Sequence, residues 1–422
     1  MTLEAAAIRL LVRNWRGRYT VPAGGLYPHQ WSWDSAFIAI GWRHLSARRA
    51  QQELESLFSA QWSDGRLPQI VFDPSRDDDY SPGAAFWRSA ELPGSPPVPT
   101  AGLVQPPNHA WAALLVHRAD PRESRRRGFL ERAYPALVAW HTYLRDRRTD
   151  ASGLAHVVHP WESGMDNSPF WDEPLSAVPE AGLDRVPRPD LEHAAATDRP
   201  SDTEYRKYLH LAAAYRDAGV ADDGSEQFRV HDPAVNALWA RSELALGEIA
   251  GELGERADHD ERAQRIADAL ERLWHPGLGC YVARDARTGR LQEHRTVSGL
   301  VPLILSGVPR APELLETLRG PSFRLGTSVL VPSADVQAPT FDTSRYWRGP
   351  SWFNTAWLMV EALERHGAEH EARSLARDVI THAEASGFAE YLHPFTAAAR
   401  GTRAFSWTAA LALDLHHRFP KA

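Results

Sequence analysis

The spacing of apolar residues predicts helices along most of the chain. Within residues 126–148, apolar side chains recur at steps of three and four, which places them on one helical face. Residues 232–253 begin with Asp232-Pro233, a capping carboxylate followed by a proline suited to the first helical turn. Similar patterns cover ten other ranges, which are 2–15, 33–45, 47–60, 107–119, 203–219, 258–274, 296–305, 350–366, 369–385 and 405–419.

Strand patterns are few and short, and the clearest is a hairpin over residues 279–291 with Thr288-Gly289 at its turn. Twelve helices with short inserts predict an all-α fold in which six helical hairpins close into a ring, an (α/α)6 toroid. An open helical solenoid is the alternative, but the chain has no repeat of fixed period to support it. We therefore expect a single domain over residues 1–422.

Two long connections interrupt the helical pattern, at about residues 62–106 and 149–202. Loops of this length inside a compact domain are more often functional than idle. In a helical toroid they would lie over one mouth of the ring and form a cap. The functional site is therefore expected at that mouth.

Composition limits the classes of function. Hydrophobic residues make up 43% of the 422 positions, and the net charge of −7 comes with scattered arginines, not the basic stripe of a nucleic-acid binder. The one cysteine, Cys280, cannot form an internal disulfide, which fits a reducing compartment. The sequence lacks a secretory signal pattern and any apolar run long enough to span a bilayer. We expect a cytoplasmic protein without nucleic-acid or membrane partners.

Tryptophan is abundant, with 16 residues, and the first aromatic cluster runs from Tyr27 to Phe37. Ser32 could cap the following helix there, and Asp34 could favour its positive end. The functional alternative is a sugar subsite, in which Trp31 and Trp33 supply apolar walls and Asp34 accepts hydrogen bonds from hydroxyls. Core filling is the other common role of such rings, so both interpretations stay open.

A second cluster, residues 159–172, places Asp166 between Trp161 and Trp171, with Gly and Pro residues that fix the turns. Burial against aromatic rings disfavours a charged carboxylate and raises its pKa, as a general acid near neutral pH requires. An Asx-turn in a surface loop is the structural alternative.

Two further aromatic clusters cover residues 341–354 and 387–410, and the second contains Glu390. Two carboxylates from distant positions, each in an aromatic loop, suit hydrolysis of a glycosidic bond. One protonates the departing oxygen while the other activates water or attacks the anomeric carbon. No HExxH motif, paired cysteines or phosphate-binding loop occurs, so neither a metal nor another cofactor is expected.

These clusters resemble the α-glycosidases of glycoside hydrolase family 63, whose clan shares an (α/α)6 catalytic domain with the trehalases. More narrowly, nearly the whole chain is similar to the compact bacterial branch that hydrolyses mannosylglycerate and glucosylglycerate. The matching segments are Tyr27 to Phe37, Trp161 to Trp171, Tyr346 to Asn354 and Phe405 to Ala410. The resemblance implies inverting hydrolysis of a small α-glycoside to a hexose and D-glycerate, and a possible dimer or tetramer.

By resemblance, Asp166 matches the general acid and Glu390 the general base. Tyr80 matches a mobile loop that covers the ligand. The substrate-binding residues that the resemblance implies are Tyr27, Gln30, Trp31, Trp33, Asp34, Tyr80, Gln105, Trp161, Arg199, Tyr205, Tyr346 and Trp347.

The acidic aglycone is held in that branch by an Arg and a Tyr six residues apart, and Arg199 and Tyr205 have this spacing. A guanidinium is the natural bidentate partner of a carboxylate. The chain departs from the family pattern at Ala397, where a Gly is expected after Thr, and at Phe405, which has no clear polar neighbour. These departures concern specificity more than chemistry.

Two other functions stay open at this point. An α-glucosidase acting on short oligosaccharides would need an open cleft and would give Arg199 no role. A non-catalytic carbohydrate-binding toroid would keep the aromatic rings and leave the carboxylates incidental. Mannosyl and glucosyl substrates are both candidates, because the two sugars differ in the orientation of one hydroxyl.

Overall fold

Helices dominate the computed structural model, which describes residues 2–182, 188, 190–193, 195–222 and 227–420. The α-helices are α1 (Leu3–Asn14), α2 (Ser32–Trp42), α3 (Ala47–Phe58), α4 (Ala84–Trp87), α5 (His109–Ala119), α6 (Pro121–Arg127), α7 (Phe129–Tyr143), α8 (Asp172–Ser176), α9 (Asp190–His193), α10 (Asp202–Asp217), α11 (Pro233–Leu253), α12 (His259–Leu270), α13 (Ala311–Arg319), α14 (Phe353–Arg365), α15 (Glu369–Ala385) and α16 (Ser406–Arg418). The shorter turns are η1 (Pro74–Asp79), η2 (Ser89–Glu91), the π-turn η3 (Leu144–Arg148), η4 (Pro160–Ser163), η5 (Pro169–Trp171), η6 (Ala196–Asp198), η8 (Glu271–Leu273) and η9 (Val297–Ile304).

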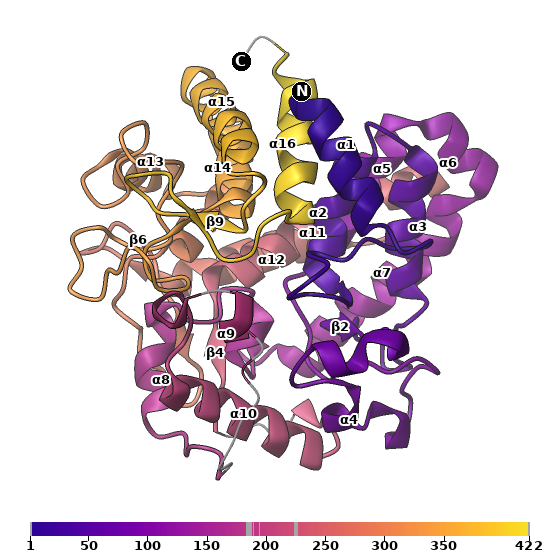
Figure 1. Cartoon of the computed structure of the whole chain (residues 1–422), viewed down its shortest axis with the longest axis horizontal. Helices are drawn as coiled ribbons and strands as arrows, with labels where there is room; N and C mark the ends of the chain where they lie inside the picture. The colour runs from indigo at the N-terminus through magenta and orange to yellow at the C-terminus, as the bar shows by residue number, and fades with distance from the viewer. Residues whose placement is uncertain (1, 183–187, 189, 194, 223–226, 421–422) are drawn as a thin grey trace.

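Six elements form a closed inner ring in the order α2, α5, α11, η9, α14 and α16, and α16 returns to contact α2. The outer layer consists of α1, α3, α7, α12, α13 and α15, each in contact with at least one ring element. Every residue of α2 is buried, whereas α3 buries a single stripe, as expected for an inner and an outer helix. The arrangement confirms the predicted (α/α)6 toroid, with the N-terminal α1 packed beside the C-terminal α16 (Figure 1).

The local signals in the sequence explain where several helices begin. Asp232 accepts a hydrogen bond from the Val235 amide at 3.0 Å, and Pro233 occupies the first turn of α11, as predicted. A capping box formed by Ser201 and Glu204 starts α10. This second cap fixes the chain that follows Arg199.

The structure corrects the predicted helix over residues 296–305, which forms the 3-10 helix η9. Pro302 lacks the amide proton that an α-helix needs, and a Cβ atom on Gly299 would lie 2.0 Å from the Tyr281 carbonyl oxygen. The chain therefore passes close to a neighbouring backbone here in a tighter turn. Helix α13 was not predicted, and the predicted helix over 126–148 is α7 followed by the π-turn η3.

Short antiparallel strands join the loops at the ends of the ring. Strand β1 (Gln30–Trp31) pairs with β2 (Ile70–Val71), and β8 (Ser351–Trp352) and β10 (Ala399–Arg400) flank β9 (Tyr391–Leu392). A third sheet has the order β3 (His156–Val157), β4 (Val230–His231) and β7 (Arg284–Asp285).

The two parts of the predicted hairpin at residues 279–291 pair with different segments of the chain. Strand β6 (Cys280–Tyr281) pairs back with β5 (Trp274–His275), while the Asp285 amide donates to the Arg290 carbonyl at 2.9 Å across the Thr288-Gly289 turn. The predicted turn is therefore present, and Arg284 before it pairs with Leu291 after it, whereas the start of the predicted hairpin, Cys280-Tyr281, pairs with β5.

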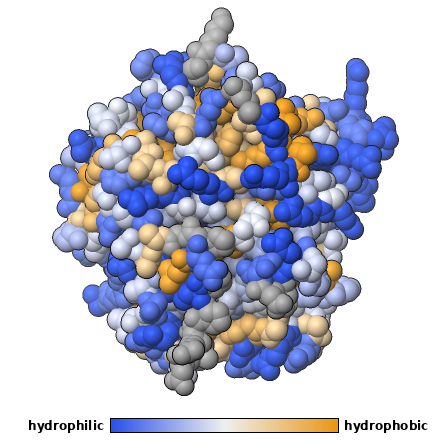
Figure 2. All heavy atoms as spheres, in the orientation of Figure 1, coloured by the Kyte–Doolittle hydropathy of each residue, from blue (hydrophilic) through white to orange (hydrophobic). Residues whose placement is uncertain are grey.

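The connections at residues 62–106 and 149–202 carry α4, α8 and α9 and lie with α10 on the lower side of the view in Figure 1. The Tyr205 hydroxyl on α10 donates to the Ser81 carbonyl oxygen at 3.1 Å, so the first connection contacts the helix that follows the second. Figure 2 shows hydrophilic residues over most of one face, with apolar residues in smaller groups. None of the helices in the described ranges is long and apolar enough to cross a membrane.

Candidate active site

A cavity of about 880 Å³, which includes its open mouth, lies beside the first turns of the inner helices α2 and α16. Its wall consists of Pro22, Leu26, Tyr27, Trp31, Trp33, Asp34, Gln69, Tyr80, Ser81, Gln105, Trp161, Gly164, Asp166, Asp190, Arg199, Pro200, Tyr205, Tyr346, Glu390, Phe405 and Trp407. The fold thus brings together both predicted catalytic carboxyls and all of the predicted substrate-binding residues except Gln30 and Trp347.

Glu390 is 1% exposed and lies immediately before β9. Its Oε1 accepts hydrogen bonds from the hydroxyls of Tyr27 at 3.0 Å and Tyr346 at 2.9 Å. Its Oε2 accepts a hydrogen bond from the Thr402 amide at 3.0 Å. Three donors from separate parts of the chain therefore fix both oxygens of this carboxylate.

Arg199 supplies a positive charge beside that carboxylate. Its Nη2 lies 3.8 Å from Glu390 Oε2, and both Nη atoms donate to the Tyr27 hydroxyl at 3.2 Å. The guanidinium also lies over the Tyr346 ring, 4.7 Å from its centroid. A buried carboxylate requires such a partner, because an unpaired charge away from water is costly.

Gly401 makes room for the Glu390 carboxylate. Its φ of +62° falls in the left-handed region that favours glycine. A Cβ atom at this position would lie 2.3 Å from Glu390 Oε2. The connection after β10 therefore approaches the carboxylate more closely than any other residue would permit.

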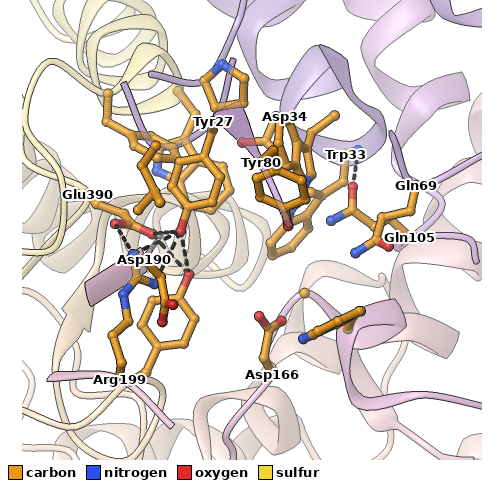
Figure 3. A pocket seen from close by; sticks show the side chains of 18 of the residues that line it. Tyr27, Trp33, Asp34, Gln69, Tyr80, Gln105, Asp166, Asp190, Arg199 and Glu390 are labelled. Atoms are coloured by element: carbon orange, nitrogen blue, oxygen red, sulfur yellow. Dashed lines mark hydrogen bonds and ion pairs between the residues drawn. The ribbon is translucent and has the colours of Figure 1, made fainter. Parts of the chain in front are cut away.

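Asp166 lies in the loop between η4 and η5, apart from the hydrogen-bonded group around Glu390 (Figure 3). Burial raises the pKa of Asp166 to about 7, with the positive charge of Arg199 opposing and the negative charge of Glu390 adding to the rise. The Tyr208 hydroxyl donates to the Asp166 carbonyl at 2.9 Å and holds its backbone. Asp166 can thus carry a proton near neutral pH, as a general acid must.

The first turn of α2 provides another wall of the cavity. Asp34 is buried there, and desolvation, with smaller contributions from Glu390 and Asp166, raises its pKa well above the ordinary value. The Trp33 amide donates to Gln105 Oε1 at 3.2 Å. A Cβ atom on Gly164 would lie 2.5 Å from the Trp33 ring, so this indole packs directly on the loop that carries Asp166.

The cap side of the cavity is aromatic. The Tyr80 ring meets the Trp31 ring edge-on at 5.1 Å between centroids. Tyr205 stands nearby, with the guanidinium of Arg188 over its ring at 4.3 Å. Tyr80 from the first long connection and Trp161 from the second line the cavity, and Tyr205 at the start of α10 bonds to Ser81 beside them.

Gln30 and Trp347 are the two predicted binding residues that the fold does not bring to the cavity wall. The Gln30 amide nitrogen donates to Ser35 Oγ at 2.9 Å and to the Glu53 carbonyl at 3.0 Å, in the core. The Trp347 ring stacks on the Trp352 ring, with centroids 3.8 Å apart and planes within 2°. Gln30 precedes the cavity residue Trp31 on β1, where consecutive side chains point to opposite faces. Trp347 follows the cavity residue Tyr346 in a turn, where its φ of +58° directs the indole away from the cavity.

The cavity also contains polar residues that were not predicted from the sequence, of which Gln69 and Asp190 are the clearest. The Gln69 Oε1 atom is buried without a hydrogen-bond partner among the described residues. Arg188 donates to both carboxylate oxygens of Asp190 at 2.9 Å. Gln69 adjoins the apolar pair Ile70-Val71 and Asp190 lies in an acidic loop, so neither stands in a pattern that indicates a site.

Residues 27–408 match the family model described as the mannosylglycerate hydrolase MGH1-like glycoside hydrolase domain. The chain belongs to this family. A mannosylglycerate hydrolase from Rubrobacter radiotolerans is 40% identical over 98% of this chain and 96% of its own length. A glucosylglycerate hydrolase from Mycolicibacterium hassiacum is 35% identical over 98% of this chain and 97% of its own length.

Solved structures agree with the sequence relatives. The crystal structure of the family 63 mannosylglycerate hydrolase from Thermus thermophilus, in complex with Tris and D-glycerate, superposes with a TM-score of 0.90. The two chains are 38% identical, and the match covers 98% of this chain and 99% of that one. The predicted membership of glycoside hydrolase family 63 is therefore confirmed. Within the described ranges, no group of three His, Cys, Asp or Glu residues could hold a metal ion.

Proposed function

We propose that this glycoside hydrolase cleaves α-linked mannosylglycerate, glucosylglycerate or both with inversion, releasing the hexose and D-glycerate. The observation that carries the proposal is the pairing, in one cavity, of two carboxyls in opposite environments. Asp166 has a pKa raised to about 7 by burial, whereas Glu390 accepts three hydrogen bonds beside Arg199. When two carboxyls in one site lie in different environments, one can stay protonated as the acid while the other acts as the base.

In the proposed reaction, Asp166 donates its proton to the glycosidic oxygen as the bond from that oxygen to the anomeric carbon breaks. Glu390 takes a proton from a water molecule that attacks the same carbon from the opposite face. The departing glycerate keeps the glycosidic oxygen and the proton from Asp166. The hexose receives the oxygen of water, so the configuration at the anomeric carbon inverts.

The sugar is proposed to lie between apolar and polar walls. Trp33 and Trp407 offer ring surfaces to its C–H faces, and Phe405 extends this apolar side. Asp34 and Gln105 stand on the same cavity wall with groups that can bind hydroxyls. This division between ring faces and hydrogen-bonding groups suits a pyranose.

Arg199 is the proposed receptor for the glycerate carboxylate. Its guanidinium is buried in the cavity wall, and its Nε has no hydrogen-bond partner in the described part of the chain. The guanidinium thus keeps an unpaired donor, and a charge-assisted bond to a carboxylate is the strongest use of its charge. The glycerate-containing relatives described above support the same aglycone.

The test is a hydrolysis screen of mannosylglycerate, glucosylglycerate and maltose with purified protein. Release of D-glycerate from at least one glycosylglycerate, with little cleavage of maltose, is the expected result. Early NMR spectra should show the β anomer of the hexose first, because inversion of an α-glycoside gives the β product. Cleavage of maltose alone would favour the oligosaccharide α-glucosidase, and no cleavage of any substrate would favour a binding protein.

Three further expectations belong to this proposal. Residues 1–422 would act as one catalytic domain, with residues 62–106 and 149–202 as its cap. The enzyme would work in the cytoplasm and could assemble as a dimer or tetramer. Light scattering coupled to size-exclusion chromatography tests the assembly state directly.

A further inference from the structure

A buried arginine, Arg348, holds the loop that carries the acid, residues 164–172. Arg348 is 6% exposed, and its Nε donates to Asn167 Oδ1 at 3.3 Å. Its Nη1 donates to Asp172 Oδ2 at 2.9 Å. Its Nη2 lies 3.5 Å from Glu204 Oε1, at the start of α10. One side chain thus contacts both halves of the acid loop and the helix beside it.

The contact to Asn167 leads directly to the acid. Asn167 Nδ2 donates to Glu204 Oε1 and to the Tyr208 hydroxyl, both at 3.1 Å. The Tyr208 hydroxyl in turn donates to the Asp166 carbonyl at 2.9 Å. Arg348 therefore acts on the Asp166 backbone through two hydrogen-bonded neighbours.

The same arginine belongs to the segment that contacts the other carboxyl. Two residues before it, Tyr346 donates to Glu390 at 2.9 Å, and the Tyr346 amide donates to the Asp198 carbonyl at 3.1 Å. Arg345, next to Tyr346, pairs with Glu204 as well. The segment 345–348 is thus tied to the base at one end and to the acid loop at the other.

We infer that Arg348 is a positioning residue, whose guanidinium fixes the separation of Asp166 and Glu390 by clamping the acid loop to the segment that carries Tyr346. Arg348 does not line the cavity and so acts through its neighbours. A guanidinium presents several donors in one rigid plane, which suits three partners at once better than the single ammonium of lysine. This role rests on the proposed function, in which Asp166 and Glu390 are the acid and the base.

A loosened acid loop would admit further water to Asp166, which is already partly exposed to the cavity. The charged and titratable groups that face Asp166 are Arg199, Glu390, Asp34, Tyr80, Tyr208 and Tyr346. Burial is the largest cause of its raised pKa, so hydration would lower that pKa towards the ordinary value. The acid works in its protonated form, and the loss of activity at high pH would therefore begin at a lower pH.

The experiment compares Arg348→Met and Arg348→Lys with a control, Arg295→Met. Arg295 also makes an ion pair, with its Nη1 2.9 Å from Asp335 Oδ2, but neither residue lines the cavity. In Arg348→Met, kcat on the preferred glycosylglycerate should fall roughly tenfold to a hundredfold, since small displacements of catalytic groups cost this much. KM should change much less, and Arg348→Lys should recover part of kcat.

The pH at which kcat/KM falls on the alkaline side distinguishes a positioning role of Arg348 from a general structural role. This fall is called the basic limb of the profile. We expect this limb to move down by about one pH unit in Arg348→Met and to stay in place in Arg295→Met. A ¹³C NMR titration of the Asp166 carboxyl, assigned by its loss in Asp166→Asn, should show the same downward shift without any substrate. An unchanged limb and titration in folded Arg348→Met, or an equal shift in Arg295→Met, would overturn the inference.

A second variant covers the case in which Arg348→Met does not fold. Asp172→Asn removes one charge of the clamp at a side chain that is 42% exposed, and should shift the Asp166 titration in the same direction by a smaller amount. No shift in this variant would count against the clamp. Failure of the wild-type enzyme to release glycerate would overturn the proposed function, whereas the substrate-free titration would still decide the role of Arg348.

Discussion

At the scale of single residues, the chemistry depends on how one carboxyl is kept protonated near neutral pH. Burial raises the pKa of Asp166 to about 7, and this residue must be protonated to act as an acid. Activity should therefore fall as pH rises through about 7. Asp166→Asn and Glu390→Gln should each lower kcat by on the order of 10²–10⁴, the usual contribution of proton transfer.

Steady-state kinetics at several pH values test both parts of this prediction. Circular dichroism and a ligand-binding measurement with the product hexose serve as controls, since neither amide should disturb the fold. Near wild-type turnover in one of the variants would remove that residue from the mechanism.

Arg199 is the proposed glycerate receptor and also contacts Tyr27 and Glu390, so its substitution should have two effects. Loss of a charge-assisted bond to glycerate should weaken binding by roughly 1.5–3 kcal/mol, which is about tenfold to over a hundredfold in affinity. Because Arg199 also donates to Tyr27 and lies beside Glu390, Arg199→Ala should lower kcat as well. On an uncharged glycosylglycerol, kcat should fall while KM scarcely changes.

Parallel kinetics on the charged and the uncharged substrate measure these effects separately. Arg199→Lys is the matched variant, because it keeps the charge and loses the bidentate geometry. Equal increases of KM on both substrates would mean that Arg199 only maintains the structure, and would leave the glycerate aglycone without a receptor.

The limits of sequence reasoning at this scale follow from side-chain direction. Asp166 and Glu390 were recognisable because each stands in a loop dense in aromatic residues. Gln30 was predicted beside Trp31 but lies in the core, because consecutive side chains on β1 point to opposite faces. Gln69 was missed because a lone amide beside an apolar strand carries no periodicity.

At the scale of elements, β9, β10 and the turn after them position Glu390, the proposed base. Gly401 lies in that turn with φ of +62°, and a Cβ atom there would lie 2.3 Å from Glu390 Oε2. Gly401→Ala should therefore displace the carboxylate and lower kcat by more than tenfold, while stability falls by roughly 1 kcal/mol or more from the strained backbone.

The control for this prediction is Gly289→Ala, at a turn with φ of +75° where an added Cβ meets no other atom within 4 Å. That variant should lose comparable stability and keep its kcat. Kinetics and thermal denaturation of the two variants separate backbone strain from displacement of Glu390. Equal kcat values for both would contradict the close approach.

Helix type was harder to predict than helix position. The apolar run at 296–305 has the density of a buried helix, yet it forms η9 because Gly299 packs on the Tyr281 carbonyl and Pro302 interrupts the hydrogen-bond ladder. Such a close approach comes from the neighbouring backbone and leaves no local signal. The ring closes nonetheless, since a 3-10 element can fill an inner position with the same apolar face.

At the scale of the whole molecule, stability should depend on pH through buried carboxyls remote from the chemistry. Glu53 is buried and accepts hydrogen bonds from the hydroxyls of Thr20 and Ser35, both at 2.7 Å, so it joins the chain before α2, α2 itself and α3. Burial raises its pKa from the ordinary value of 4.5 to about 8, although these hydrogen bonds oppose the rise. The folded protein therefore holds this proton over a pH range in which the unfolded chain has lost it.

The sign of the effect follows from proton linkage. Between pH 4.5 and about 8 the folded state binds one more proton at Glu53 than the unfolded state does, so the free energy of unfolding falls as pH rises. One proton corresponds to roughly 1.4 kcal/mol per pH unit. This stabilisation is complete below pH 4.5 and is lost by about pH 8.

Glu53→Gln should remove that dependence, because an amide keeps the shape and cannot ionise. Urea denaturation of both proteins from pH 5 to 9 should show the variant gaining on the wild type by roughly 1.4 kcal/mol per unit, levelling off near pH 8. Glu261→Gln, at a side chain that is 77% exposed, is the control for the loss of one surface carboxylate. A constant difference for Glu53→Gln would show that Glu53 titrates alike in both states, and that the link between α2 and α3 is made by an ionised carboxylate.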